Sequence, residues 1–155
     1  MTTTFKTIED TASPMLRDFA SRLEDEIPVK LQSAAAFRFA DIAVNNFGFD
    51  GEARPKVWKS LSKPYADEFH GGARTPTLIL SGDMQESIRI ENELEKSVVV
   101  CDSPYAEDHQ EGVPSRNLPA RPFFPMTEDG EATEYAQVEC LAAAGMELER
   151  ILNEL

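Results

Sequence analysis

Proline and glycine divide this chain into two helical ends and an irregular middle. The sequence holds ten prolines and eight glycines, and most of them lie between Phe47 and Pro125. Proline has no backbone N–H and its ring clashes with the preceding turn, so long helices are excluded from that region. The flanking segments carry apolar residues at helical spacing instead. We therefore predict two helical ends that enclose a loop-rich middle.

The N-terminal end is expected to form two helices. Ser13 and Pro14 have the residue types of an N-cap and a first helical position. Pro28 is expected to end or kink this first helix. A second helix is predicted from about Val29 to Phe47. It is apolar nearly all round, which indicates burial in its own fold or in an oligomer.

Two short strands are predicted in the middle of the chain. Ile88 and Ile90 alternate with charged residues, which is the strand period, and a continuous apolar run extends from Val98 to Cys101. Only a few polar residues separate these runs, so a β-hairpin is expected over residues 87–101. Brief helical turns are predicted at residues 81–86 and 104–112.

A last helix is predicted to begin near Glu131 or Thr133. Its apolar residues share one stripe, which consists of Val138, Leu141, Ala142, Gly145, Leu148, Leu152 and Leu155. We predict one domain over residues 1–155 with an α+β fold. Its small antiparallel sheet, a β-hairpin, would be packed by two N-terminal helices and a C-terminal helix, with long middle loops.

The net charge of −13 limits the kinds of partner. A surface with 28 acidic and 15 basic side chains repels phosphate and anionic lipid, which disfavours general nucleic-acid and membrane binding. The charge is uneven, because residues 53–75 are mainly basic and residues 127–155 are mainly acidic. This is either ordinary charge scatter on a solvated surface or a basic arm that pairs with the acidic helix of another copy.

Targeting and disulfide signals are not found in the sequence. Cys101 and Cys140 are far apart and form no CxxC motif, so a disulfide framework is not expected. The first ten residues lack the basic and apolar regions of a secretory signal. No apolar run reaches the roughly 18 residues of a membrane span. We expect a protein made in a reducing cytoplasm.

No constellation of residues predicts catalysis. The only histidines are His70 and His109, and no serine lies in a G-x-S-x-G frame. Cys101 and His109, with Asp102 or Asp108 beside them, match no structural zinc spacing. Phosphate-binding glycine loops are also missing. We therefore expect no catalytic residue, no cofactor and no metal, and predict that the protein is not an enzyme.

Several aromatic residues lie in the irregular, proline-rich segments: Trp58, Tyr65, Tyr105, Phe123 and Phe124. Aromatic and arginine side chains on ordered loops are typical of interaction surfaces. They can equally fill the core beneath the loops, and the sequence leaves both interpretations open.

Five short motifs follow one another between Phe47 and Met126. In order, they are Asp50-Gly51 followed by Trp58, Leu61-Ser62 and Tyr65; the run Leu78 to Met84 followed by Ser87-Ile88; Tyr105-Ala106; His109-Gln110 with Gly112; and Pro119-Ala120-Arg121-Pro122-Phe123. In this order they resemble the phage virion-morphogenesis family, also called the tail-completion family, of Mu-like phages and prophages. Glu111 departs from the family, whose members more often have an aromatic residue there, and Met84 stands in place of the usual leucine.

The resemblance implies a non-enzymatic structural protein of a tailed phage virion that assembles in the host cytoplasm. It would form a homo-oligomeric, hexameric ring at the neck that completes the tail or joins it to the head. Its partners would be other neck, connector and tail proteins, with DNA passing through the lumen without specific binding and no membrane contact. The alternatives are a tail terminator or capsid-associated structural protein and, from another class, a small metal-dependent hydrolase that uses His70, His109 and acidic residues.

Interface residues are predicted on the same motifs: Trp58, Tyr65, Tyr105, His109, Gln110, Arg121, Pro122 and Phe123. We expect Arg121 to contact an acidic group, in the same subunit or across a boundary, and Tyr105 and Phe123 to be largely buried. Residues 48–77 are predicted to form an extended arm that becomes ordered on a neighbouring chain, with Trp58 as its anchor. In the alternative, Trp58 belongs to the core of its own subunit.

Overall fold

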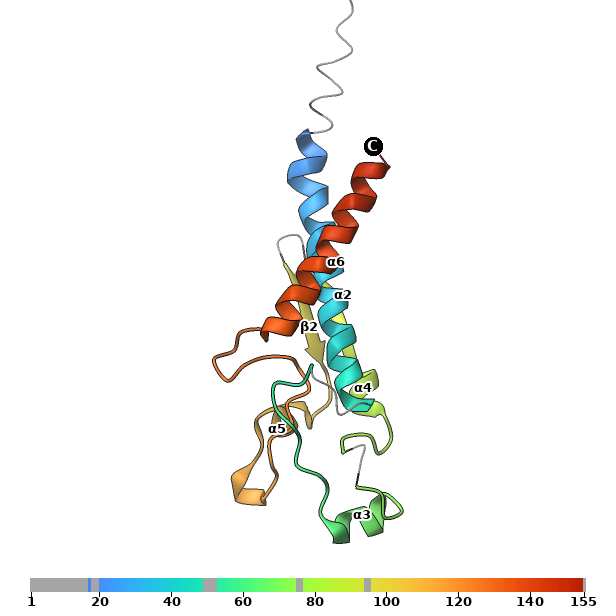
Figure 1. The fold of residues 1–155 in the computed structure, drawn as a ribbon, viewed down its shortest axis with the longest axis vertical. Coiled ribbons are helices and arrows are strands. Elements are labelled where there is room, and N and C mark those ends of the chain that lie inside the picture. Colours follow the sequence, from blue (N-terminus) through green and yellow to red (C-terminus); the bar gives the residue numbers. More distant parts are fainter. Residues whose placement is uncertain (1–16, 18–19, 49–52, 75–76, 94–95, 155) are drawn as a thin grey trace, which may run out of the picture.

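The computed structural model describes residues 17, 20–48, 53–74, 77–93 and 96–154. It confirms a small α+β fold with helices and one two-stranded antiparallel sheet. The two long helices α2 (Ile27–Gly48) and α6 (Glu134–Asn153) lie side by side along the long axis of the molecule (Figure 1). The remaining elements are η1 (Arg22–Glu26), α3 (Lys63–Phe69), α4 (Asp83–Glu86), β1 (Ile88–Asn92), β2 (Ser97–Cys101), α5 (Ala106–Glu111) and the 3-10 turn η2 (Pro114–Arg116).

The N-terminal helix continues through Pro28. A π-helical segment, η1, leads directly into α2, and the N–H of Ile27 donates to the carbonyl oxygen of Arg22 five residues earlier. The wider π turn changes the hydrogen-bond register just before the residue that has no N–H to donate. The helix therefore does not end at Pro28, one of the two outcomes predicted there, and the predicted helix start at Ser13 lies outside the described residues.

The predicted β-hairpin is confirmed. Strands β1 and β2 pair antiparallel, with Ile88 opposite Cys101 and Ile90 opposite Val99. Both strands pack against α2, and α6 packs against the same helix. The predicted helical turns before and after the hairpin are α4 and α5.

Helix α6 begins where the sequence predicted. The Thr133 side chain caps the helix by accepting from the N–H of Ala136. The buried residues Ala136 and Ile151 lie on the face turned toward α2. Arg38 of α2 forms an ion pair with Glu139 of α6, and this hydrogen bond raises the pKa of the arginine.

The apolar stripe predicted for α6 does not face α2. Val138, Leu141 and Leu152 are exposed and Leu148 is half-buried, whereas Ala136 and Ile151 are the buried residues of the helix. Leu155, the last residue of the predicted stripe, lies outside the described residues.

The hydrophobic core lies at the C-terminal end of α2. Phe47, Trp58 and Phe123 form its buried centre. Partly buried apolar residues surround them, from the hairpin, α4, α5 and the segments before α4 and after Phe123: Leu78, Ile79, Met84, Ile88, Cys101, Ala106 and Phe124. The core therefore joins the long helix to three segments of the loop-rich middle.

Candidate interaction site

Two segments that are far apart in the sequence are joined by side-chain hydrogen bonds. The indole Nε1 of Trp58 donates to the carbonyl oxygen of Pro122 at 2.9 Å. In return, Nε of Arg121 donates to the carbonyl oxygen of Lys59 at 3.1 Å. The Trp58 hydrogen bond is buried and that of Arg121 is part-buried, so each one satisfies a donor side chain that is largely removed from water.

Helix α5 is fixed to the same place through Gln110. Its Oε1 accepts from the backbone N–H groups of Phe123 and Phe124, each at 3.1 Å. The N–H of Arg121 donates to the carbonyl oxygen of His109 at 2.6 Å. Direct hydrogen bonds thus join two of the sequence motifs to each other, His109-Gln110 and Arg121-Pro122-Phe123.

The end of α2 completes this arrangement. Asn46 donates through Nδ2 to the carbonyl oxygen of Phe123 at 2.8 Å. The Phe47 ring meets Phe123 at 5.1 Å and Trp58 edge-on at 6.3 Å between ring centroids. We call residues 46–47, 58–59, 109–110 and 121–124 the central junction. The sequence patterns did not single out Asn46. Its polar side chain within a helix that is apolar nearly all round is the signal that could have found it.

Gly112 is required by the close packing beside the central junction. Its φ of 81° lies in the left-handed region. A Cβ at this position would come within 2.5 Å of the backbone nitrogen and 3.0 Å of the Cα of Ala120. Only glycine combines this φ with such an approach of two backbone segments.

Arg121 is held by a backbone carbonyl and not by an acid. Only 5% of it is exposed, and among the described residues its side-chain hydrogen bond goes to Lys59. Burial lowers the pKa of the guanidinium from its ordinary value, and the Tyr65 hydroxyl opposes that shift. The expected contact with an acidic group is therefore not present within the described part of the subunit.

Four of the predicted interface residues, Trp58, Arg121, Pro122 and Phe123, are buried within their own chain. Their burial favours the alternative that Trp58 belongs to the core, and their role at an interface stays a prediction. The predicted burial of Phe123 is confirmed. His109 and Gln110 are half-buried in the central junction.

Tyr105 and Tyr65 remain as exposed interface candidates. The prediction that Tyr105 is buried is wrong, because the residue is 64% exposed. It precedes α5, and that helix turns Ala106 toward the core, which leaves the tyrosine on the outer side. Tyr65 lies on α3 and is also exposed.

Residues 61–74 form a closed arm around α3 at the far end of the molecule from the C-terminus (Figure 1). Two hydrogen bonds close its base. Nε of Arg74 donates to the carbonyl oxygen of Leu61 at 2.7 Å, and the N–H of Leu61 donates to the carbonyl oxygen of Arg74 at 3.4 Å. Ala66 is fully buried, and its carbonyl oxygen accepts from the N–H groups of His70 and Gly72. Residues 61–74 are thus folded within one chain. The prediction that an arm over residues 48–77 becomes ordered on a neighbouring chain stays a prediction, and residues 49–52 and 75–76 lie outside the described residues.

Aromatic side chains gather on this arm. The rings of Tyr65 and Phe69 lie 4.8 Å apart between centroids, and His70 lies 5.8 Å from Tyr65. Tyr65 and Phe69 are both exposed. An exposed aromatic pair on an ordered projection is typical of a surface that contacts another protein.

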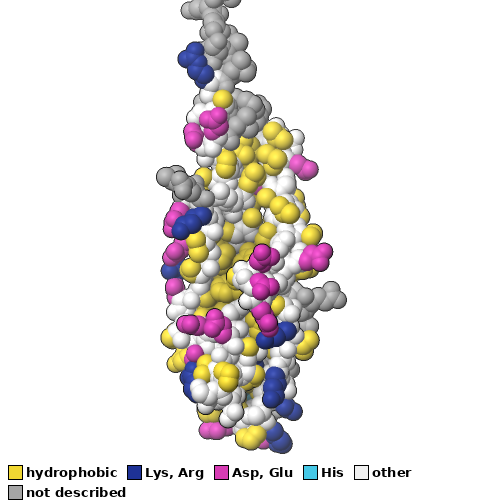
Figure 2. All heavy atoms as spheres, turned by 90° about the vertical axis from the view of Figure 1, so that its left-hand side faces the viewer, with side chains coloured by type: hydrophobic (Ala, Val, Ile, Leu, Met, Phe, Trp, Pro, Cys, Tyr) yellow, Lys and Arg dark blue, Asp and Glu magenta, His cyan; other side chains and the backbone are white. Residues whose placement is uncertain are grey.

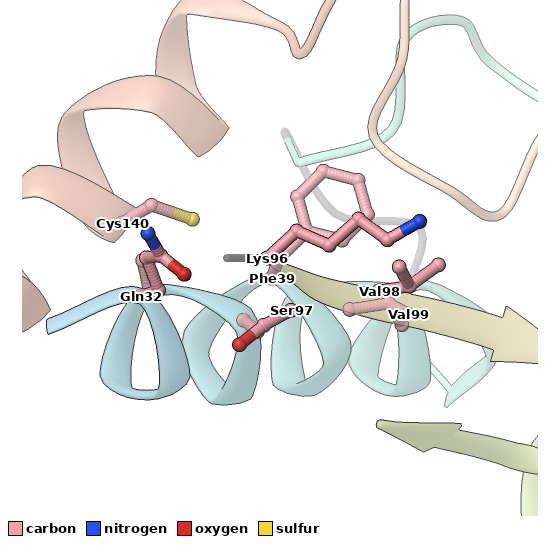
Figure 3. Close-up of a pocket in the computed structure, with 9 residues that line it drawn as sticks. Gln32, Phe39, Lys96, Ser97, Val98, Val99 and Cys140 are labelled. Carbon is pink, nitrogen blue, oxygen red and sulfur yellow. The ribbon is translucent and has the colours of Figure 1, made fainter. Parts of the chain in front are cut away.

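A shallow groove of about 520 Å³ runs between α2, β2 and α6 (Figure 3). Its lining is mainly apolar and includes Phe39, Val98, Val99 and Cys140. Burial raises the pKa of the Cys140 thiol, so the sulfur is held in its less nucleophilic form. The groove therefore presents an apolar surface and no activated nucleophile among these residues.

The acidic and histidine side chains do not assemble into a metal site in the part of the chain that the structure describes. His70 lies on the arm against Tyr65, whereas His109 lies in the central junction. Across the described ranges, no helix is long and apolar enough to cross a membrane.

The fold and this arrangement define a small α+β protein with a central junction and a projecting arm. No protein-family model, no curated protein and no solved structure matches the chain.

Proposed function

We propose that the protein is a structural assembly protein of a tailed phage particle. It forms a homo-oligomeric, hexameric ring at the neck that completes the tail or joins it to the head. Its partners are neighbouring copies and other neck, connector and tail proteins. One observation carries the proposal: residues of the resembling motifs converge on a central junction that supports an ordered arm with exposed aromatic residues.

The junction supports this function by fixing the base of the arm. Trp58 and Lys59 immediately precede the arm, and both are tied to residues 121–122. A rigid arm loses little conformational entropy when it docks on a neighbour. Tyr65 and Phe69 are suitable anchors, because aromatic side chains bury a large area and have few rotatable bonds.

Charge supports a contact between the arm and an acidic surface. Lys56 and Lys59 are exposed next to the arm, and Glu134 and Glu149 are exposed on α6. Attraction between such groups guides association, and salt weakens it over a Debye length of about 8 Å at physiological ionic strength. The net charge of −13 is also compatible with DNA passing a ring without binding to it.

The proposal is tested by the mass and shape of the purified protein. We expect light scattering and negative-stain electron microscopy to show rings at high protein concentration and low salt. A Tyr65→Ala, Phe69→Ala double variant should fail to form rings while its circular dichroism is unchanged. Leu80→Ala, which removes an exposed apolar side chain from another segment, serves as the control.

The alternative classes give different results. A tail terminator would bind the end of isolated tail tubes, whereas a head-joining ring would bind the connector of filled heads. A hydrolase would hold about one zinc or manganese ion per chain, and His109→Ala would release it. A chain that stays monomeric with or without isolated tails and heads would refute the assembly role.

A further inference from the structure

The outer face of α6 carries large apolar side chains that nothing in the described chain covers. Val138, Leu141 and Leu152 are exposed there, with Leu141 at 73%. Tyr135 and Met146, also exposed, flank them. We call these five residues and Gly145 the outer stripe. In Figure 2, hydrophobic side chains gather over the upper part of the molecule, where α2 and α6 lie.

Two residues of the outer stripe are placed symmetrically about Gly145, whereas the position symmetric to Leu141 is Glu149. Val138 lies seven residues before Gly145 and Leu152 lies seven residues after it. Seven residues are two helical turns, so all three lie along one seam of the helix. If a second α6 crosses antiparallel with its own Gly145 at the same point, Val138 of each helix meets Leu152 of the other. A two-fold contact needs this self-complementarity. If residue i of one copy contacts residue j of the other, then residue j of the first copy must contact residue i of the second.

We propose that the outer stripe is a docking surface for the α6 helix of a second copy of this chain, antiparallel and with the two-fold axis at Gly145. The proposal does not depend on the phage assignment, because it uses a surface other than the arm. The contact joins copies in pairs. It cannot by itself close a ring of identical head-to-tail contacts, so a ring would use a different surface.

Charge favours the antiparallel direction. Glu149 is exposed on the same face of α6. In a parallel pair, the Glu149 carboxylates of the two copies would lie against each other and repel. In the antiparallel pair, Glu149 of one copy lies near Leu141 of the other. Antiparallel helices also set the positive end of one dipole beside the negative end of the other. Arg150 does not decide the direction, because it already pairs with Glu147 and Glu154 of its own helix.

Gly145 fits a close helix crossing. It lies within α6, where glycine is less favourable than alanine. A Cβ added to it would meet nothing within 4 Å in the described part of its own chain, so packing against these residues does not require glycine. A second helix that crosses at this point does gain from it, because a missing side chain lets two backbones approach.

The size of the surface indicates a pair that dissociates readily. A standard stable interface buries about 800 Å² on each partner. One face of a single helix supplies the apolar centre of such an interface and little of its rim. We therefore expect an equilibrium between monomer and dimer that depends on protein concentration.

Sedimentation of the full chain at several concentrations tests the pairing. We expect the parent to move from monomer to dimer as concentration rises and Leu141→Glu to remain monomeric. The melting temperature of the diluted variant should match that of the diluted parent, because Leu141 is exposed in the monomer. Leu80→Glu, also at an exposed leucine, is the matched control and should still dimerise. Equal dimerisation of Leu141→Glu and parent would overturn the proposal.

Oxidative cross-linking tests the geometry. With diamide as oxidant, two thiols lose their protons and two electrons to form one disulfide, and diamide is reduced to its hydrazine. Gly145→Cys should cross-link to itself, since it lies on the two-fold axis. Val138→Cys alone should not, but a mixture with Leu152→Cys should. The parent controls for Cys101 and Cys140. Self-linking of Val138→Cys would show a parallel pair and refute the antiparallel contact, and so would the absence of any variant-specific cross-link.

Discussion

The indole of Trp58 donates a hydrogen bond to the carbonyl oxygen of Pro122, 64 residues further along the chain. The Trp58 ring also packs edge-on against Phe47 at the end of α2. This one side chain therefore links the base of the arm to the long helix and to the proline-rich segment. Both the stability of the subunit and the placement of the arm should therefore depend on Trp58.

Substitution of Trp58 should separate its hydrogen bond from its packing. Trp58→Phe leaves the buried Pro122 oxygen without its donor, which costs about 1–3 kcal/mol. Trp58→Ala also opens a cavity and should cost about 3–5 kcal/mol. Urea unfolding followed by circular dichroism measures both. Val57→Ala, at a neighbouring residue that is 89% exposed, should change the free energy of unfolding by no more than about 0.5 kcal/mol. Equal losses for all three variants would contradict the central junction.

Gly112 and Gly130 form a matched pair, because both have a φ of 81°. Alanine is strained at this φ at either position, and Gly112 also has a ψ of 160°, a combination that is essentially restricted to glycine. Only at Gly112 would the new Cβ also collide with the backbone of Ala120. We expect Gly112→Ala to lower the free energy of unfolding by clearly more than Gly130→Ala does. Thermal unfolding of the two variants side by side gives the comparison, and equal effects would show that the segment near Ala120 yields freely.

Arg121→Ala should destabilise the subunit although it removes no ion pair. It leaves the Lys59 carbonyl oxygen without its donor, which costs about 1–3 kcal/mol, and it removes the packing of the buried side-chain stem. Arg116→Ala is the control, because Arg116 is exposed and pairs with Asp108 at the surface, a contact worth about 0–1 kcal/mol. Arg121→Ala should therefore lower the urea unfolding midpoint more than Arg116→Ala does. A smaller loss for Arg121→Ala than for Arg116→Ala would argue against the role of Arg121.

His109 should make the fold less stable in mild acid. Burial lowers the pKa of His109 below its ordinary value, and Arg121 beside it acts in the same direction. Its buried Nδ1 has no hydrogen-bond partner among the described residues. As pH falls through about 6.5, the unfolded chain binds a proton at this ring before the folded chain does, so the free energy of unfolding decreases. The decrease ends below the folded-state pKa.

The His109→Gln variant isolates this effect. The variant cannot take up a proton at residue 109, so the parent should lose more stability than the variant between pH 7.5 and the lower pKa. Urea unfolding at a series of pH values measures the difference. Parallel curves for parent and variant would show that His109 does not titrate differently in the folded chain.

Gly145→Ala should have opposite effects on the monomer and on the pair. In the diluted monomer, alanine improves the helix and should add about 0.5–1 kcal/mol of stability. In the proposed pair, the added methyl group lies at the crossing and should weaken dimerisation. Thermal unfolding at low concentration and sedimentation at high concentration report the two effects separately. A variant that dimerises as well as the parent would place the crossing elsewhere.

Local structure followed from the sequence where neighbouring residues decide it. Alternation at Ile88 and Ile90 and the run from Val98 to Cys101 predicted the hairpin that the structure contains. Thr133 before a helical pattern predicted the start of α6. These elements depend on hydrogen bonds and side-chain spacing within about ten residues, which a sequence displays directly.

Tertiary structure alone decided which residues are inside. Trp58 and Arg121 have the residue types of an interface, but hydrogen bonds to Pro122 and Lys59 place them within the subunit. The spacing of Val138, Leu141 and Leu152 revealed a stripe, but it could not reveal that α2 packs on the other face of α6. Periodicity states that a helix has an apolar face. Which face is buried depends on how a second helix packs against it, and here the buried face is the one that carries Ala136 and Ile151.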